Sequence, residues 1–422
     1  MNIKSSLILF FAACLAFYSN AQDNDSTQED IRSNPIIDTI AQSAAIKYPS
    51  YLNLRSNHIQ FNGDDWSGLG CRMRSADSTR VNIVHIGDSH LQADIGTAVT
   101  RNRLGQKFGS AGRALVVPFK LAGTNEPNDY TIKTTATMRN SRLLKTPWAT
   151  TMGFTGISLE PEKEIFDFEF STREPFDSVE VYYTGFALEL AQDSLFTENQ
   201  PGLLKVGLES PTTSTSLKFR AKKGTSIHGF NLHKGNTGIA YNVIGNNGAT
   251  YGTYNAVNSF ADGVSRFSPA LIIISLGTNE AFGKTSDEEL RRQMDMLIRN
   301  LRQTCPDAKL LLTTPAECQR KIVTRRRSGK RRRARRTTSY LVNANINRLR
   351  NVILDYGKDE GIPVYDFYDV AGGSGSSFKW LSDRYLNKDR IHLTHAGYTL
   401  QGNLFTDALE EAIGMSFSHT QD

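Results

Sequence analysis

Residues 81–90 read Val-Asn-Ile-Val-His-Ile-Gly-Asp-Ser-His, and this stretch decides the fold class. Its apolar run, which ends abruptly at Gly-Asp-Ser, is typical of a strand that is buried on both faces of a parallel sheet. In open α/β folds the chemistry takes place at the carboxyl edge of such a sheet. The stretch therefore predicts a strand that delivers the Ser89 hydroxyl to that edge.

Strand and helix patterns alternate around this stretch and again in the second half of the chain. The expected helices cover residues 91–108, 285–301, 341–356 and 394–414, and the expected further strands cover 270–276, 309–314 and 362–367. Such alternation builds a parallel sheet that is covered by helices. We therefore expect an α/β fold.

Between residues 120 and 235 the pattern changes. Short runs such as 166–170 and 179–183 alternate apolar and polar residues, which predicts antiparallel strands with one buried face each. We interpret residues 120–235 as a β-sandwich module inserted into an α/β domain of residues 81–119 and 236–422. Four aromatic residues of the module could form a sugar platform, although a place in the core is favoured for most of them: Trp148, Tyr182, Tyr183 and Phe186.

The N-terminus has the features of a secretory signal. A basic residue precedes an apolar stretch from Leu7 to Phe17, and a cleavage site follows at Ala21. That stretch is too short to cross a bilayer as a helix, and no later stretch is a transmembrane candidate. We expect residues 1–21 to be a signal peptide, residues 22–80 a partly disordered lead-in, and the protein to be exported to the periplasm or cell envelope. Lipid anchoring at Cys14 is the less favoured alternative.

Three cysteines follow the expected signal peptide, at Cys71, Cys305 and Cys318. An exported protein can hold a disulfide, but three cysteines leave at least one thiol unpaired. Their pairing stays open at this point, and so does the oligomeric state.

The positive charge of the chain is concentrated in one segment. Residues 320–336 contain eleven of the 49 Lys and Arg residues and none of the 43 acidic residues. Such a segment can bind an anionic envelope polymer or lipid headgroups, or nucleic acid through its phosphates. It holds no aromatic side chain on which a base could stack. A solvated loop without a specific role is the simplest interpretation.

Later segments offer the partners that a serine nucleophile needs. A serine hydroxyl attacks a carbonyl only after a base takes its proton, and His392 can be that base at neutral pH. Asp389, three residues earlier, can orient the imidazole and stabilise its charged form. Asn279 and the backbone N–H of Ser89 can donate to the oxyanion, and a glycine N–H is expected as a third donor.

These residues resemble the four sequence blocks of the SGNH (GDSL-like) hydrolase superfamily: Gly87-Asp88-Ser89, a glycine block, Gly277-Thr278-Asn279 and Asp389-x-x-His392. The resemblance implies a flavodoxin-like three-layer α/β/α fold and ester hydrolysis through an acyl-serine intermediate. It places the oxyanion glycine at Gly248, with Gly245 as the competing position. No His/Cys spacing predicts a metal site, and no glycine fingerprint predicts a nucleotide cofactor.

Four features of the chain resemble the bacterial peptidoglycan O-acetylesterases of that superfamily. They are Gly-Asp-Ser-His-Leu-Gln-Ala-Asp at 87–94, the β insertion, Asn-Gly-Ala-Thr at 247–250 and Asp-Arg-Ile-His-Leu-Thr-His-Ala-Gly-Tyr at 389–398. This resemblance implies removal of O-acetyl groups from muramic acid, and a carbohydrate-module-like insertion between the first two blocks. Two features depart from the pattern. His395 stands where the superfamily often has proline, and residues 320–336 belong to no block.

Several neighbours of these blocks admit two roles. His90 either lines the substrate site or only packs against and caps the following helix. His395 is a rival base, although its place in the first turn of a helix favours a spectator. His85 is expected in the core. Gln92 and Asp94 could contact a sugar, but a solvated helix face is favoured for both.

The sequence thus predicts an exported serine esterase that acts on an O-acetylated cell-wall glycan through an acetyl-serine. Three alternatives stay open. The first is a carbohydrate O-acetylesterase for other polysaccharides, and the second is a transferase that passes the acetyl group to a sugar hydroxyl. The third is a non-enzymatic envelope protein that binds polyanions through residues 320–336.

Overall fold

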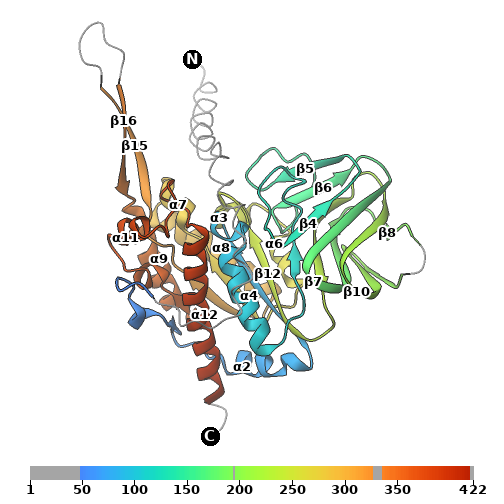
Figure 1. Ribbon diagram of the computed structural model, residues 1–422, viewed down its shortest axis with the longest axis horizontal. Helices are drawn as coiled ribbons and strands as arrows, with labels where there is room; N and C mark the ends of the chain where they lie inside the picture. Colours follow the sequence, from blue (N-terminus) through green and yellow to red (C-terminus); the bar gives the residue numbers. More distant parts are fainter. Residues whose placement is uncertain (1–47, 193–194, 327–334, 419–422) are drawn as a thin grey trace. The chain divides into compact units, whose positions relative to one another are not determined.

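The computed structural model describes residues 48–192, 195–326 and 335–418 (Figure 1). The expected signal peptide, Cys14 and most of the expected lead-in lie outside these residues. Every element described below lies in one compact unit within Ser50–Asp422. Among the described helices, none combines the length and the apolar character that crossing a bilayer requires.

A six-stranded sheet forms the centre of the α/β part. Its strands lie in the order β1-β17-β14-β13-β2-β12, and every neighbouring pair is parallel except β1 with β17. The bounds are β1 Ile59–Gln60, β2 Arg80–Gly87, β12 Gly238–Gly245, β13 Leu271–Ser275, β14 Lys309–Thr313 and β17 Val364–Tyr365. Counted along the chain, the five parallel strands run 2-1-3-4-5 across the sheet, which is the flavodoxin-like order. The predicted α/β fold class is confirmed.

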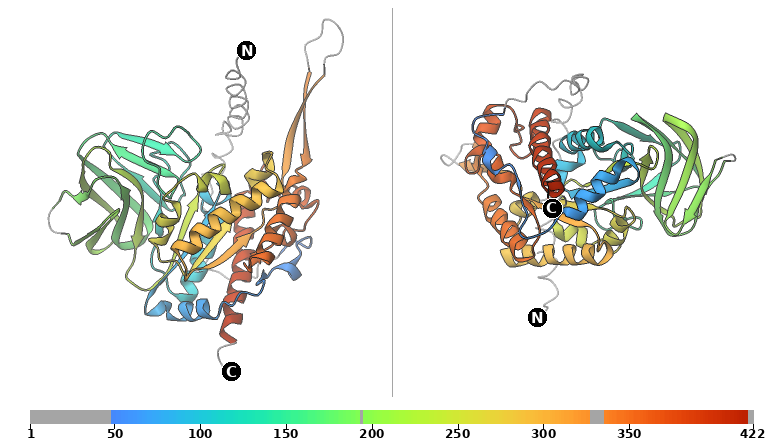
Figure 2. Two further views of the ribbon diagram at one scale, coloured as in Figure 1. Left: turned by 180° about the vertical axis from the view of Figure 1, so that it is seen from behind. Right: turned by 90° about the horizontal axis from the view of Figure 1, so that it is seen from below.

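Helices cover both faces of this sheet (Figures 1 and 2). One face carries α2 Ser67–Arg74, α4 Ile95–Phe108 and α12 His395–Ser418, and the other carries α5 Tyr251–Asn255, α6 Phe260–Ser265, α8 Asp287–Thr304 and α9 Asn345–Asp359. The connections contain α3 Ser89–Gln92, α7 Thr278–Phe282, α10 Phe367–Val370, α11 Ser376–Ser382 and the 3-10 turns η5 Leu54–Ser56 and η6 Ser75–Asp77.

Two glycines let α4 and α12 approach each other closely. A Cβ at Gly402 of α12 would lie 2.5 Å from the carbonyl oxygen of Gly96 in α4. A Cβ at Gly96 would in turn lie 3.1 Å from the carbonyl oxygen of Tyr398. Because α4 comes soon after Ser89 and α12 starts just after His392, this contact fixes the separation of those two residues.

Several element boundaries differ from the sequence predictions. The expected helix 91–108 is interrupted at Asp94, whose left-handed backbone (φ 52°) separates α3 from α4. The helix expected at 285–301 starts at Asp287 as α8, and its cap is Ser286, whose Oγ accepts from the N–H of Glu289 at 3.2 Å. The expected strand 362–367 shortens to β17.

A second sheet, antiparallel and nine-stranded, is inserted between α4 and β12. Its strands are β3 Ala114–Val116, β4 Tyr130–Lys133, β5 Met138–Arg142, β6 Ile157–Pro161, β7 Ile165–Thr184, β8 Leu188–Leu190, β9 Thr197–Gln200, β10 Leu203–Ala221 and β11 Ser226–His233. The main order is β5-β6-β11-β7-β10-β8, while β3 pairs with β11, β4 with β7 and β9 with β10. This sheet therefore begins at Ala114, ahead of residue 120.

The inserted sheet folds over on itself to form a core. Strands β7 and β10 are 20 and 19 residues long, and the register of β10 shifts between Gly207 and Ser214, as at bulges that bend a strand. Phe168 and Phe170 of β7 contact Phe230 of β11, with ring centroids 4.9 and 4.8 Å apart. Burial alternates along residues 165–170 of β7, as the alternating run predicts, whereas β6 and β11 are buried at every position.

The inserted sheet shares a core with the α/β part. The ring centroids of Tyr182 in β7 and of Phe154 lie 5.3 and 5.6 Å from that of Phe267, which follows α6. Tyr182 and Tyr183 are buried, so these two aromatic residues belong to the core, whereas Phe186 is exposed.

A buried ion network crosses the same boundary. Arg101 of α4 binds Asp94 at 2.9 Å and Asp129 of the insertion at 3.1 Å, and Arg113 binds both carboxylates as well. The expectation that Asp94 lies on a solvated helix face is wrong, because the left-handed turn at this residue directs its carboxylate onto two buried arginines.

The basic segment is part of a two-stranded hairpin, where the sequence predicted a loop followed by a helix. Strand β15 Gln319–Arg326 pairs with β16 Arg335–Val342, from Gln319 opposite Val342 to Arg326 opposite Arg335. Figure 1 shows this basic hairpin extending from the end of the α/β part at which α3 and α7 lie. The expected helix 341–356 accordingly starts at Asn345 as α9.

Candidate active site

The candidate site lies at the carboxyl ends of β2, β12 and β13. Ser89 begins α3 directly after β2, Gly248 follows β12, and Asn279 lies in α7 after β13. Along the sheet, the strand order reverses between β2 and β13. Such a switch point is where open α/β sheets bind their ligands.

Ser89, His392 and Asp389 form an unbroken line of hydrogen-bonding atoms. Ser89 Oγ lies 2.8 Å from His392 Nε2, and His392 Nδ1 lies 2.7 Å from Asp389 Oδ2. The other carboxylate oxygen of Asp389 accepts from the backbone N–H groups of Ile391 and His392 at 2.9 and 3.0 Å, so the turn itself orients the acid. The structure thus brings the three predicted catalytic residues together.

The turn that presents Ser89 depends on the two residues before it. A Cβ at Gly87 would lie 2.7 Å from Leu91 Cδ2 and 2.9 Å from a backbone oxygen of β13, so a side chain there would collide with both neighbours. Asp88 then caps α3, since its Oδ1 accepts from the N–H of His90 at 2.9 Å.

The charges around His392 favour its protonated form. Burial lowers the pKa of His392, but the hydrogen bond and charge of Asp389, together with the charge of Asp88, raise it above the usual value of 6.5. For Asp389, burial raises the pKa, and the bond to His392 outweighs this and lowers it. This imidazole is therefore a base whose protonated form has a fixed counter-charge.

The backbone N–H groups of Ser89 and Gly248 are suited to bind an oxyanion. Gly248 has φ +81°, and none of the described residues accepts a hydrogen bond from its N–H. Ser89 is the first residue of α3, so its N–H has no acceptor within the helix. The competing position, Gly245, packs against α3, since a Cβ there would lie 2.6 Å from the backbone nitrogen of Gln92.

The side-chain amide of Asn279 lies beside the glycine block. Its Nδ2 donates to the carbonyl of Ala249 at 3.0 Å and to Asp88 Oδ2 at 3.2 Å. Burial raises the pKa of Asp88 to about 6. Because both amide hydrogens have protein acceptors, donation to an oxyanion requires that one of these bonds be shared with the ligand.

Two buried side chains that the sequence reasoning did not assign to the site hold the oxyanion segment. Gln92 Oε1 accepts from the N–H of Asn247 at 2.7 Å, and Gln92 Nε2 donates to Asn125 Oδ1 of the insertion at 2.7 Å. The expected solvated position of Gln92 is therefore wrong. Gln92 follows Ser89 by three residues, and residues with this spacing lie on one side of a helix. This spacing is the sequence signal that could have placed Gln92 at the site. Glu280 Oε1 accepts from the N–H of Tyr251, at the start of α5.

The other histidines occupy distinct positions. His90 Nδ1 lies 3.1 Å from the hydroxyl of Tyr398, and burial lowers the pKa of His90 to about 3, so its ring is neutral. Its ring centroid lies 5.3 Å from that of His392. His85 is buried as expected, and His395 is exposed as the first residue of α12. Contact between His90 and a substrate stays a prediction.

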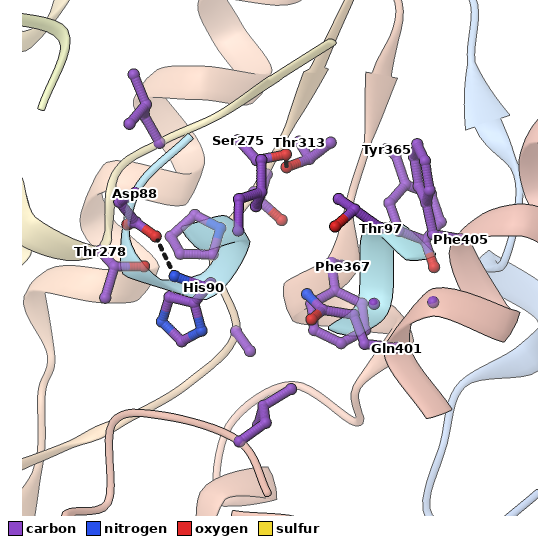
Figure 3. Close-up of a pocket in the computed structure, with 18 of the residues that line it drawn as sticks. Asp88, His90, Thr97, Ser275, Thr278, Thr313, Tyr365, Phe367, Gln401 and Phe405 are labelled. Atoms are coloured by element: carbon purple, nitrogen blue, oxygen red, sulfur yellow. Dashed lines mark hydrogen bonds between the residues drawn. The ribbon is translucent and has the colours of Figure 1, made fainter. Parts of the chain in front are cut away.

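A cavity of about 80 Å³ lies next to the site (Figure 3). Figure 3 shows Asp88, His90 and Thr278 on one side of it and Thr97, Tyr365, Phe405 and Gln401 on the other. Neither Ser89 nor His392 lines this cavity, so it is separate from the reacting atoms. Within the described part of the chain, no three His, Cys, Asp or Glu side chains gather as a metal site, and the three cysteines are free thiols.

Comparison with known proteins finds one matching family and several similar structures. Residues 227–400 match the GDSL-like lipase/acylhydrolase family. A solved structure of a peptidoglycan O-acetylesterase is similar with a TM-score of 0.69 and 17% sequence identity, over 85% of this chain and 99% of that one. The family match thus covers the second half of the α/β part, and the likeness to the solved structure shows that the two chains share a fold.

Other solved structures match smaller parts of the chain. A lipase/acylhydrolase from Enterococcus faecalis is 21% identical, with a TM-score of 0.30, over 42% of this chain and 77% of that one. An acetyl xylan esterase is 18% identical, with a TM-score of 0.30, over 40% of this chain and 81% of that one. No curated protein sequence matches the chain.

The pairing of His392 with Asp389 determines the expected pH dependence. The neutral imidazole is the base, so kcat/KM should fall as the pH decreases through the pKa of His392, which lies above 6.5. Asp389→Asn removes the counter-charge, so the acid limb should move to lower pH while kcat falls by about 10⁴-fold. The pH profile of p-nitrophenyl acetate hydrolysis measures both effects. An acid limb that does not move in the variant would contradict the pairing.

The left-handed backbone of Gly248 makes a second substitution informative. Gly248→Ala strains the segment at φ +81° and should misdirect its N–H, lowering kcat by about 10²–10³-fold with little change in KM. Steady-state kinetics with p-nitrophenyl acetate provide the measurement. Gly252→Ala in the neighbouring α5 is the matched control and should keep wild-type kcat, because a Cβ there meets only ordinary contacts. Equal kcat for both variants would count against the role of Gly248.

Proposed function

We propose that this chain removes O-acetyl groups from a cell-wall glycan through an acetyl-Ser89 intermediate. The observation that carries the proposal is the line from Ser89 Oγ through His392 to Asp389, with distances of 2.8 and 2.7 Å. The N–H groups of Ser89 and Gly248 are the proposed oxyanion donors, which the tetrahedral intermediate of acyl transfer needs.

The proposed reaction has two halves. Ser89 Oγ attacks the acetyl carbonyl and passes its proton to His392 Nε2, while the N–H groups of Ser89 and Gly248 bind the oxyanion, with the Asn279 amide as the third donor. As the ester bond breaks, His392 returns the proton to the sugar oxygen. Water, deprotonated by the same imidazole, then attacks the acetyl-serine and releases acetate. Asp389 holds the ring in place through both halves.

Two observations support a small acyl group on a glycan. Leu144, in the insertion between β5 and β6, lies 3.5 Å from the position of a Cβ at Gly248, so the insertion limits the space beside the oxyanion segment. The similar structure over 85% of this chain is a peptidoglycan O-acetylesterase. Residues 120–235 are accordingly proposed as a module that borders the substrate, with His90 lining the site. Export through residues 1–21 gives access to such a glycan.

Removal of one hydroxyl tests the nucleophile. Ser89→Ala should abolish release of acetate from O-acetylated peptidoglycan and from p-nitrophenyl acetate, because no other atom of the proposed line can form the acyl-enzyme. Acetate is measured by a coupled assay, and the melting temperature shows that the fold is retained. Ser216→Ala, on an exposed position of β10, is the control and should keep full activity.

The same assay separates the alternatives. Turnover of O-acetylated xylan without turnover of O-acetylated peptidoglycan would assign the esterase to other polysaccharides. Acetylated sugar in place of free acetate would identify a transferase. Substantial turnover by Ser89→Ala would refute the proposed acetyl-Ser89 intermediate.

We also propose that the basic hairpin binds an anionic envelope polymer that carries the esters. The support is its charge, eleven cations without an acid in residues 320–336, and its place at the same end of the α/β part as α3 and α7 (Figure 1). Lys321 is exposed on β15. Positive charge of this density attracts a polyanion without any specific pocket.

Charge removal on the hairpin tests this proposal. Replacement of Arg325 and Arg326 with Gln should weaken binding to peptidoglycan sacculi by about tenfold at low salt, with the difference vanishing at high salt because the attraction is screened. Co-sedimentation measures the binding. The same change at Lys222 and Lys223, exposed on the insertion, is the matched control and should have little effect. An equal loss of binding in both double variants would show that the hairpin contributes no more than any other exposed positive charge.

A further inference from the structure

Arg390, inside the Asp389–His392 turn, has an unusual backbone. Its φ is +65°, in the left-handed region that favours glycine and in which an arginine is strained. The strained residue is held by the local turn, since its N–H donates to the carbonyl of Asn387 at 2.9 Å. A strained residue between two members of a catalytic line persists only where surrounding contacts hold it.

Those surrounding contacts come from the basic hairpin. The Arg390 guanidinium lies over the ring of Tyr340 in β16, with its central carbon 4.2 Å from the ring centroid. It also donates to Gln319 Oε1 at 2.9 Å, and the N–H of Gln319 donates back to the Arg390 carbonyl at 2.9 Å. Both strands of the hairpin therefore contact this one residue of the turn.

The hairpin end of this contact is fixed in the protein interior. Gln319 is 1% exposed, and its Nε2 donates to Ser377 Oγ at 3.3 Å. Ser377 Oγ in turn donates to Glu317 Oε2 at 2.6 Å. Arg390 is thus joined to a buried hydrogen-bond network and not to a freely moving arm.

The base of the same hairpin also contacts the helix that carries Asn279. Arg320 donates to the carbonyl of Ala281 at 2.8 Å, and its guanidinium lies over the ring of Phe282 at 5.3 Å. Ala281 and Phe282 are the last two residues of α7. Two separate segments of the site, the turn and α7, are therefore held by neighbouring residues of β15.

We propose that Arg390 is a positioning residue, which ties the Asp389–His392 turn to the base of the basic hairpin and thereby keeps His392 in line with Ser89. It acts through the turn and touches no reacting atom. This inference rests on the proposed function of the site for its kinetic consequence, but the alignment of His392 with Asp389 can be observed without any substrate.

The consequence for His392 has a definite direction. The charged or titratable groups that face its ring are Asp389 on its own turn, Asp88 before α3, and the neutral His90. The hydrogen bond from His392 to Asp389 stabilises the protonated imidazole. A looser turn weakens that bond, so His392 should give up its proton at lower pH and accept the Ser89 proton less well.

The experiment replaces Arg390 with glycine, which keeps the left-handed backbone and removes the guanidinium. In Arg390→Gly, the titration of His392 followed by NMR of histidine-labelled protein should move to lower pH. The kcat for p-nitrophenyl acetate should fall about tenfold with KM nearly unchanged, because a small displacement of a catalytic group affects the reaction more than binding. Arg390→Lys should behave similarly, since an ammonium group cannot reproduce the planar contact with both partners.

Tyr340→Ala tests the same contact from the hairpin side and should reproduce both changes, whereas Tyr340→Phe keeps the ring and should titrate as wild type. The matched control is Arg384→Gly, the same substitution at an exposed residue with φ +61°. It should alter neither the titration nor kcat.

Two results would overturn the inference: a wild-type His392 titration in Arg390→Gly, or an equal shift in Arg384→Gly. An active Ser89→Ala protein would refute the proposed reaction and leave the NMR comparison valid, so the two failures are distinguishable.

Discussion

The hydrogen bond between Ser89 Oγ and His392 Nε2 is the contact on which the rest of the site depends. It joins residues 303 positions apart, so no local turn can form it. The parallel sheet brings the end of β2 to one edge, and the close packing of α4 on α12 at Gly96 and Gly402 returns the last turn of the chain to that edge. A substitution at Gly96 or Gly402 that changes this packing would therefore lower the rate of the reaction by moving His392 relative to Ser89, without changing a contact with the substrate.

The parts of the site that could be predicted are those with a local signature. Ser89 stands where an apolar run stops, Asn279 stands at the same place after another strand, and Asp389 and His392 share a short turn before a helix. Parallel strands align their carboxyl ends, so these separate signals point to one edge of the sheet. The fold class followed from the same alternation of patterns, and the helices and strands that were expected in the α/β part shifted in their bounds.

What the sequence did not predict depends on contacts between distant segments. The strands of the basic hairpin hold charged residues on consecutive positions, without the alternation that marks a half-buried strand, so they looked like a loop. Gln92 and Asp94 looked like solvated helix residues because partners of theirs, Asn125 and Arg113, lie outside their own helix, in the segment between α4 and β4. The left-handed backbone at Arg390 has no signature in residue type, since arginine rarely adopts it.

The most direct test of the account is to locate the atom that reacts. The protein would be incubated with a serine-reactive phosphonate and digested, and its peptides mapped by mass spectrometry. The account predicts one phosphonyl adduct, on Ser89, whose formation slows strongly in His392→Ala because the hydroxyl then has no base. An adduct on another residue, or labelling of Ser89 at the same rate without His392, would contradict it.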